Sequence, residues 1–462
     1  MRDRGPEPID HRRVVGELGQ HRDKYAGVGL AQVGPQFIGI GRHDNRVSRR
    51  WPAPVLRLST ERDTSRRRCR GAVYPSAMQR VHYEADHRAF AELAGDFADK
   101  EVAPHIAAWD ADGIVPREIF GKAGRVGLLG FAADERFGGV GVRDFRYNQI
   151  LIEAFMDADC GGVGLSFAVH NDICLPYLAD LTTPEQQDRW LPGFVSGDLI
   201  AAIAMTEPGT GSDVAAIRTS AVDAGDHFVV NGAKTFITNG QNADVVITAV
   251  RTSPDRHRGL TLLVLERGMP GFERGRNLDK LGLHSQDTSE LSFTDVKVPK
   301  TNVLGEVGHG FGHLMKNLPQ ERMQIAVGSL ARARAALGWT IDYVRERTAF
   351  GKPIGALQNT RFALADVATE VSVAEAFIDR CVMELNAGRL SATDAAKAKL
   401  WATEMEFRCL DSCQQLFGGY GYMREYPIAR SAIDARVTRV YGGTSEIMRE
   451  IIGRDLALVP KD

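Results

Sequence analysis

The sequence predicts an α+β protein in which helices, strands and helices follow one another in three blocks. Hydrophobic residues recur every three to four positions in residues 78–198 and 305–462, which is the period of an amphipathic helix. Short apolar runs separated by Gly, Pro, Asn and Asp fill residues 199–304 and indicate strands. Strands do not alternate with helices, so a parallel dinucleotide-binding sheet is not expected. We expect an N-terminal helical domain, a central β domain and a C-terminal four-helix bundle with these bounds.

Residues 1–77 precede the three blocks and have no sustained hydrophobic period. They are rich in arginine, but they also contain acidic residues such as Asp3, Glu7 and Asp10, whereas organellar transit peptides are poor in acids. We expect a disordered extension or an over-extended start, with the folded unit beginning at Met78. A bacterial cytoplasm is favoured over the mitochondrial matrix.

The composition is typical of a globular protein and excludes several classes. The 462 residues are 44% hydrophobic and 25% charged with a net charge of -2, which does not favour nucleic-acid binding. No apolar run approaches the roughly 18 residues that span a bilayer. The cysteines form no CxxC pair, and Cys409 and Cys413 lie on the apolar stripe of a predicted helix, so they are expected in the core rather than at a metal. No metal site is predicted.

Two segments of the β block carry possible ligand-binding groups. Residues 204–213 (Ala-Met-Thr-Glu-Pro-Gly-Thr-Gly-Ser-Asp) follow a predicted strand, and their glycines would let the backbone approach a flavin or a pyrophosphate. An ordinary β-turn is the alternative. Residues 236–240 (Phe-Ile-Thr-Asn-Gly) alone indicate only the end of a strand.

Three further segments lie in the C-terminal block. They are residues 347–354 with Gln358, residues 415–422 and residues 441–447. Charged residues and paired glycines beside helices are usually helix caps, so each segment alone carries little information.

Together, in this order and at these separations, the five segments resemble the acyl-CoA dehydrogenase family across about residues 78–460. The resemblance implies FAD bound between the β domain and the bundle, an acyl-CoA substrate, an electron-transfer flavoprotein as electron acceptor, and a homo-oligomer built as a dimer of dimers. It implies flavin contacts at Met205, Thr206, Gly211, Ser212, Phe236, Ile237, Thr238, Arg347, Gln358, Gln415, Gly418, Gly419, Thr444, Ser445 and Glu446. It implies substrate contacts at Ser212, Pro319, Gln320, Arg322, Gly442 and Gly443.

Two details of this resemblance matter later. Arg347, Gln358 and the group Gln415, Gly418 and Gly419 match residues that hold the FAD of a neighbouring subunit. Many relatives have Trp at the position of Phe236.

The catalytic base is predicted at Glu321. In many family members a glutamate occupies the position of Gly442, which has no side chain to accept a proton. Residues 318–323 (Leu-Pro-Gln-Glu-Arg-Met) instead resemble the long-chain and isovaleryl branches, in which a glutamate before the arginine is the base. On helix statistics alone, Glu321 would be an acid in a first helical turn. Glu207, Glu446 and His170 are weaker candidates, and the N–H of Gly442 could still bond the thioester oxygen.

The sequence therefore predicts dehydrogenation of a fatty acyl-CoA, of medium or long chain, to the trans-2-enoyl-CoA. A branched short-chain (isovaleryl-type) acyl-CoA dehydrogenase, an acyl-CoA oxidase and a catalytically silent flavin-binding subunit remain as alternatives. A helical scaffold without cofactor is a further one.

Overall fold

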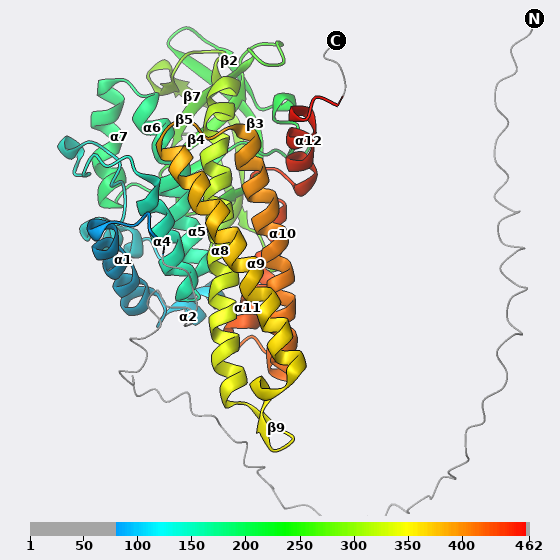
Figure 1. Cartoon of the computed structure of the whole chain (residues 1–462). Helices are drawn as coiled ribbons and strands as arrows, with labels where there is room; N and C mark the ends of the chain where they lie inside the picture. The colour runs from blue at the N-terminus through cyan, green and yellow to red at the C-terminus, as the bar shows by residue number, and fades with distance from the viewer. Residues whose placement is uncertain (1–79, 459–462) are drawn as a thin grey trace, which may run out of the picture. The chain divides into compact units, whose positions relative to one another are not determined.

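The computed structural model describes residues 80–458, and the expectation for residues 1–77 lies outside these residues. The first part of the described chain is helical, as expected (Figure 1). The helix is interrupted around Pro104, where the helical turns end at Val102 and the next helix begins at Ile106. The helices are α1 (Ala85–Phe97), α2 (Ile106–Asp112), α3 (Glu118–Arg125), α4 (Phe145–Asp157), α5 (Gly161–Ala168), α6 (Leu175–Asp180) and α7 (Pro184–Ser196).

The middle of the chain forms one mixed sheet. Its strand order is β6-β7-β3-β2-β4-β5-β8, and β1 pairs in parallel with β4 beside this path. The strands are β1 (Ala201–Ala204), β2 (Ser220–Asp223), β3 (His227–Thr238), β4 (Val245–Arg251), β5 (Leu260–Glu266), β6 (Phe272–Asn277), β7 (Thr288–Pro299) and β8 (Val303–Leu304). The expected central β domain is therefore confirmed. Apolar runs at residues 199–205, 228–230, 244–250, 260–265 and 289–298 predict β1, β3, β4, β5 and β7, whereas β2, β6 and β8 were not predicted.

Strands β4 and β5 are buried on both faces, which explains their unbroken apolar sequences. Side chains alternate across a strand, so Val245 and Ile247 pack against the N-terminal helices, whereas Val246 and Val250 pack within the β domain. Leu262 and Leu263 of β5 divide in the same way. This packing fixes the sheet against the helices that lead to Tyr177.

The last part of the chain is a helical bundle. Its long helices α8 (Gly310–Glu346), α9 (Gln358–Asn386) and α10 (Ala392–Leu416) run alongside one another (Figure 1). The shorter α11 (Pro427–Asp434) adds Ile428 to their core, and α12 (Ser445–Asp455) ends the described chain. The short strands β9 (Thr348–Ala349) and β10 (Lys352–Pro353) form the tip of the bundle far from the sheet.

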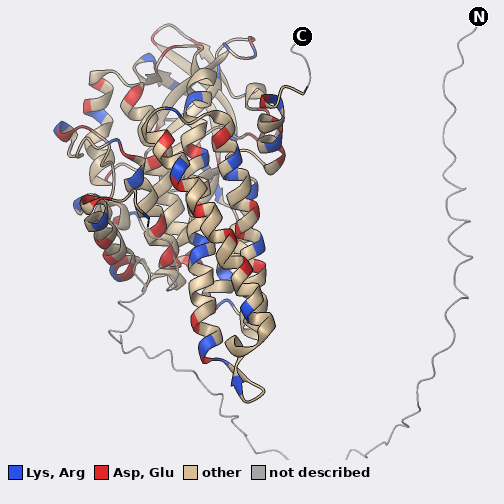
Figure 2. Cartoon of the chain, in the orientation of Figure 1, with Lys and Arg blue, Asp and Glu red and all other residues tan. Residues whose placement is uncertain are grey.

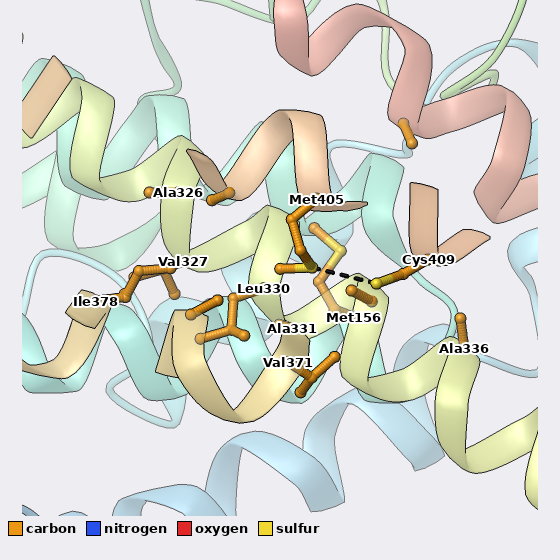
Figure 3. Close-up of a cluster of buried hydrophobic side chains, with 14 of the residues drawn as sticks. Met156, Ala326, Val327, Leu330, Ala331, Ala336, Val371, Ile378, Met405 and Cys409 are labelled. Carbon is orange, nitrogen blue, oxygen red and sulfur yellow. Dashed lines mark hydrogen bonds between the residues drawn. The ribbon is translucent and has the colours of Figure 1, made fainter. Parts of the chain in front are cut away.

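The bundle core contains the residues that the helical period predicted. Leu330, Val371 and Met405 meet there from three helices (Figure 3). Cys409 and Cys413 are buried in the same core, and the Cys409 thiol donates to Met405 Sδ at 3.4 Å. They are core residues, as predicted.

Acidic and basic residues are interspersed along the outer helices (Figure 2). Within residues 80–458, the longest helices are too polar for any of them to qualify as a membrane span.

Candidate active site

Glu321 lies in the interior of α8, eleven residues after its first residue, Gly310. The alternative of a first-turn acid is therefore wrong, because Gly310, Gly312 and Pro319 hid the true start of the helix. Pro319 has no N–H to donate within the helix, so the hydrogen-bond ladder is interrupted just before Glu321.

The Glu321 carboxyl is buried and has one well-placed donor. Glu321 is only 4% exposed, and the Tyr177 hydroxyl donates to its Oε1 at 3.0 Å. Burial raises the pKa of Glu321 to about 7, and this effect outweighs the opposing effects of the Tyr177 hydrogen bond and the Arg322 charge. A carboxylate with a pKa near neutrality is suited to act as a general base.

Neighbouring groups fix this part of α8 to the N-terminal helices and to the turn at Gly442. Gln320 donates from Nε2 to the carbonyl oxygen of Asp172 at 2.8 Å. Arg322 is buried and reaches the carbonyl oxygen of Gly442 at 3.5 Å. Arg322 thus connects the helix of Glu321 with the turn that contains Gly442.

The turn at Gly442 and Gly443 is left-handed at both residues, with φ of +66° and +96°. A β-carbon at position 442 would overlap with Ile325 Cδ1, and Ile325 lies one helical turn after Glu321 on α8. The side chain of Ile325 therefore fills the space in which a side chain at position 442 would begin.

The first predicted flavin segment, residues 204–213, forms a turn after β1 that side-chain contacts hold in place. Glu207 accepts the backbone N–H groups of Arg218 and Thr219 and forms a buried ion pair with Lys234 at 2.9 Å. Lys234 also donates to the carbonyl of Met205. Glu207 therefore has a structural role, whereas Thr206 is half-buried and Gly211 and Ser212 are exposed.

Phe236 is the most unusual residue of the second segment. It has a φ of +60° at an irregularity in the β3–β7 pairing, and the residue is 67% exposed. A strained backbone that presents a large aromatic ring to solvent is typical of a ligand-binding position. Thr238 is half-buried, but the side chain of Ile237 points into the core of the β domain, so Ile237 could contact a cofactor only through its backbone.

The predicted contacts to a neighbouring subunit's FAD lie together at the far tip of the bundle. The guanidinium of Arg347 lies 5.9 Å from the ring of Tyr420, which follows Gly418 and Gly419. Gln358, Gln415 and both glycines are exposed, and the space above the glycines is open. At a rise of about 1.5 Å per residue, Gln415 is about 24 Å along α10 from Lys399, which contacts Gly443. One chain therefore does not bring the tip and the Glu321 region together.

The last of the five predicted segments, residues 441–447, leads into the start of α12. Thr444 is its N-cap and accepts the N–H of Ile447, and Glu446 is exposed. The Ser445 hydroxyl donates to Glu404 Oε1 at 2.7 Å, so the buried Ser445 side chain is directed toward α10.

His170 has a structural environment. Its ring stacks on Phe194 with 3.6 Å between the centroids, and burial lowers the pKa of His170 to about 4. Within residues 80–458, no group of three His, Cys, Asp or Glu side chains is arranged to hold a metal ion.

Two residues near the site were missed by the sequence reasoning. They are Tyr177, which donates to Glu321, and Lys399, which donates to the carbonyl of Gly443. Neither belongs to a motif, and their partners lie 144 and 44 residues away in the chain.

The segments that carry predicted flavin contacts fit a flat aromatic cofactor with a phosphate tail. They offer an exposed ring at Phe236, a glycine turn with open space at Gly209 and Gly211, and half-buried hydroxyls at Thr206 and Thr238.

Comparisons with known proteins match the whole described fold. Three family models, described as the N-terminal, middle and C-terminal domains of acyl-CoA dehydrogenase, match residues 84–198, 202–296 and 308–457. The long-chain specific acyl-CoA dehydrogenase of Sus scrofa mitochondria is 43% identical over 377 residues, which are 81% of this chain and 87% of the relative. The isovaleryl-CoA dehydrogenase of Oryza sativa mitochondria is 35% identical over 413 residues, 89% and 98% of the two chains.

A solved structure gives the same result for the fold. The crystal structure of an acyl-CoA dehydrogenase from Geobacillus kaustophilus matches with a TM-score of 0.80 and 45% identity, and the match covers 82% of this chain and all of the other.

Proposed function

Because the chain belongs to the acyl-CoA dehydrogenase family, whose members are FAD-dependent oxidoreductases, we propose that it converts a medium- or long-chain fatty acyl-CoA into the trans-2-enoyl-CoA with Glu321 as base. One observation carries the assignment of the base: the Glu321 carboxyl is buried beside the Tyr177 hydroxyl, which lies 3.0 Å from Oε1. Burial raises the pKa of Glu321 to about 7. The preference for longer chains is supported by the higher identity to the long-chain relative, 43% against 35% for the isovaleryl relative.

In the proposed reaction, Glu321 takes the α-proton of the thioester, and the electron pair of that C–H bond moves toward the carbonyl to give an enolate. The backbone N–H of Gly442 donates to the thioester oxygen and stabilises the charge that develops there. Bound FAD supplies the acceptor for the hydride that leaves the β-carbon, so that the C=C bond forms. Burial of Glu321 serves this step, because a carboxylate that lacks hydration is a stronger base.

The chain's own groups for FAD divide into two sets. Thr206, Ser212, Phe236 and Thr238, with the start of α12 at Thr444, would hold the cofactor of their own subunit. Arg347, Gln358 and the residues of 415–419 would hold the FAD of a neighbour, and the distance of about 24 Å along α10 supports this division. We therefore propose a homo-oligomer, built as a dimer of dimers. We also propose an electron-transfer flavoprotein as the electron acceptor and a bacterial cytoplasm as the compartment.

The decisive test replaces the Glu321 carboxyl by an amide of nearly the same shape. Glu321→Gln should keep FAD and lose about 10²- to 10⁴-fold in the rate of flavin reduction by an acyl-CoA without oxygen, because general-base catalysis contributes about that factor. Glu346→Gln, at the exposed end of the same helix, is the matched control. Undiminished flavin reduction in Glu321→Gln would show that the base lies elsewhere.

Three alternatives are tested with the same wild-type protein. The 35% identity to the isovaleryl relative over 89% of this chain supports a branched short-chain substrate as the second candidate. A panel of straight and branched acyl-CoAs, compared by kcat/KM for flavin reduction, distinguishes the two. Absence of flavin reduction by every member of the panel would favour the silent flavin-binding subunit, and substantial hydrogen peroxide during turnover would favour an oxidase.

A further inference from the structure

Lys399 of α10 is a fully buried ammonium whose hydrogen-bond partners are two backbone carbonyls. Its Nζ donates to the carbonyl of Thr438 at 3.0 Å and to that of Gly443 at 2.7 Å. Within residues 80–458, no carboxylate forms an ion pair with Lys399. Removing a charge from water without a paired counter-charge is unfavourable, and such groups are often functional.

The two carbonyls bracket the turn that contains Gly442. The same stretch is held at two more points by α10, because Glu406 accepts from the Thr438 hydroxyl at 2.8 Å and Glu404 accepts from the Ser445 hydroxyl at 2.7 Å. Two successive glycines give a backbone with wide freedom. The direction of the Gly442 N–H is therefore set by contacts from outside the turn, and Lys399 makes the nearest of these to Gly443.

A second cation approaches the turn from the opposite helix. Arg322 of α8 reaches the carbonyl of Gly442 at 3.5 Å, whereas Lys399 bonds the next carbonyl. Burial and, to a smaller extent, the charge of Arg322 lower the pKa of Lys399 to about 8, against the opposing effects of Glu404 and Glu406. Two positive groups thus flank the Gly442–Gly443 backbone.

We propose that Lys399 is a positioning residue for α-proton removal: it holds the Gly442–Gly443 backbone so that the Gly442 N–H meets the thioester oxygen, and its charge favours the enolate formed there. This role rests on the proposed function. Glu321 receives the proton, the C–H electron pair becomes the enolate, and Lys399 neither gains nor loses a proton.

The test measures the enolate directly in the FAD-loaded enzyme. A 3-oxoacyl-CoA has an acidic α-proton, so its bound form is converted to the enolate without hydride transfer, and the absorbance of the enolate can be followed against pH. In Lys399→Met, the pH at which half of the bound ligand is enolate should rise by about one unit or more, which is about a tenfold loss of enolate stabilisation. With an acyl-CoA substrate, kcat should fall much more than KM changes.

Three variants separate the role of Lys399 from general stability. Lys397→Met makes the same change at an exposed position of the same helix and should leave the enolate midpoint unchanged. Lys399→Arg keeps the charge and should restore part of the effect. Lys399→Gln keeps a donor for the carbonyls without the charge, and it should lie between wild type and Lys399→Met.

The outcomes are distinguishable. If wild type forms the enolate and Lys399→Met matches it, Lys399 only supports the fold and the inference is overturned. If Lys399→Met does not fold, the comparison of Lys399→Arg with Lys399→Gln decides, since equal enolate midpoints in these two would overturn the effect of charge. If wild type leaves the bound 3-oxoacyl-CoA protonated, the proposed function itself fails, and the role of Lys399 fails with it.

Discussion

Ile325 Cδ1 occupies the space in which the β-carbon of any residue other than glycine would lie at position 442. Gly442 also has a φ of +66°, which L-residues rarely adopt. Gly442→Ala should therefore destabilise the protein by about 1–3 kcal/mol through overpacking and backbone strain. Ile325→Val removes the overlapping methyl, so the double variant should be more stable than the sum of the single effects predicts, by about 0.5 kcal/mol or more in chemical denaturation.

Gly418→Ala is the control for this pair. Its φ of +58° imposes similar backbone strain, but its β-carbon would have no neighbour within 4 Å. Gly418→Ala and Ile325→Val should therefore be additive. Equal coupling in both pairs would mean that the effect at position 442 is backbone strain and not contact with Ile325.

The Tyr177 hydroxyl should set the lower limit of the pH range of activity. Its hydrogen bond lowers the pKa of Glu321 against the effect of burial. Removing it in Tyr177→Phe should raise the pKa of Glu321 above about 7. Because the base acts in its ionised form, the rise of kcat/KM with pH should move to higher pH by about one unit, as expected for a hydrogen bond to a charged group.

Tyr343→Phe provides the comparison for this change. This variant also removes a hydroxyl that donates to a protein oxygen, because the Tyr343 hydroxyl donates to the carbonyl of Phe417 at 3.2 Å. This hydrogen bond lies near the tip of the bundle. Its pH profile should match wild type. A profile of Tyr177→Phe that also matches wild type would exclude the hydrogen bond as a determinant of the base.

Glu321 should lower the stability of the protein at neutral pH and above. Its pKa is raised from 4.5 to about 7 by burial, so the folded state binds more protons than the unfolded state between these values. The contribution of Glu321 to the free energy of unfolding is therefore present at low pH and falls by about 3 kcal/mol as pH rises from about 4.5 to 7. Glu321→Gln should gain stability over wild type at pH 8 but not at pH 4, as measured by chemical denaturation of the FAD-loaded protein.

Glu346→Gln again serves as the control, because Glu346 is exposed on the same helix. Its stability relative to wild type should not depend on pH. A pH-independent effect of Glu321→Gln would mean that the carboxyl has the same pKa in the folded and unfolded states, so that burial does not raise it.

The order of the blocks, the central β domain and the helical bundle could be predicted from hydrophobic period alone. Strands β2 and β6 escaped prediction for a physical reason: Ser220–Asp223 has two exposed positions, and Phe272–Asn277 is largely polar with only Phe272 buried. These strands are held by pairing with their neighbours rather than by an apolar pattern. Local sequence carries little of that information.

The candidate site divides in the same way. The position of Glu321 before Arg322 can be recognised in the sequence, and its assignment as base stays a prediction. Its burial and its contact with Tyr177 depend on the packing of α6 against α8, which no spacing reveals. Lys399 is read in sequence as one of two lysines on a helix, and only the fold distinguishes it from the exposed Lys397.

The tip of the bundle allows a test of the neighbouring-subunit role. Arg347 is exposed there beside Tyr420, about 24 Å along α10 from the Gly443 end. If it holds a partner's FAD, Arg347→Ala should weaken FAD binding about tenfold while the oligomer persists, since a hydrogen bond to a charged group contributes about 1.5–3 kcal/mol. Flavin fluorescence and light scattering along one dilution series measure both properties, with Arg345→Ala as the control. Retention of FAD by dissociated wild-type subunits with undiminished affinity would assign the cofactor to one chain alone.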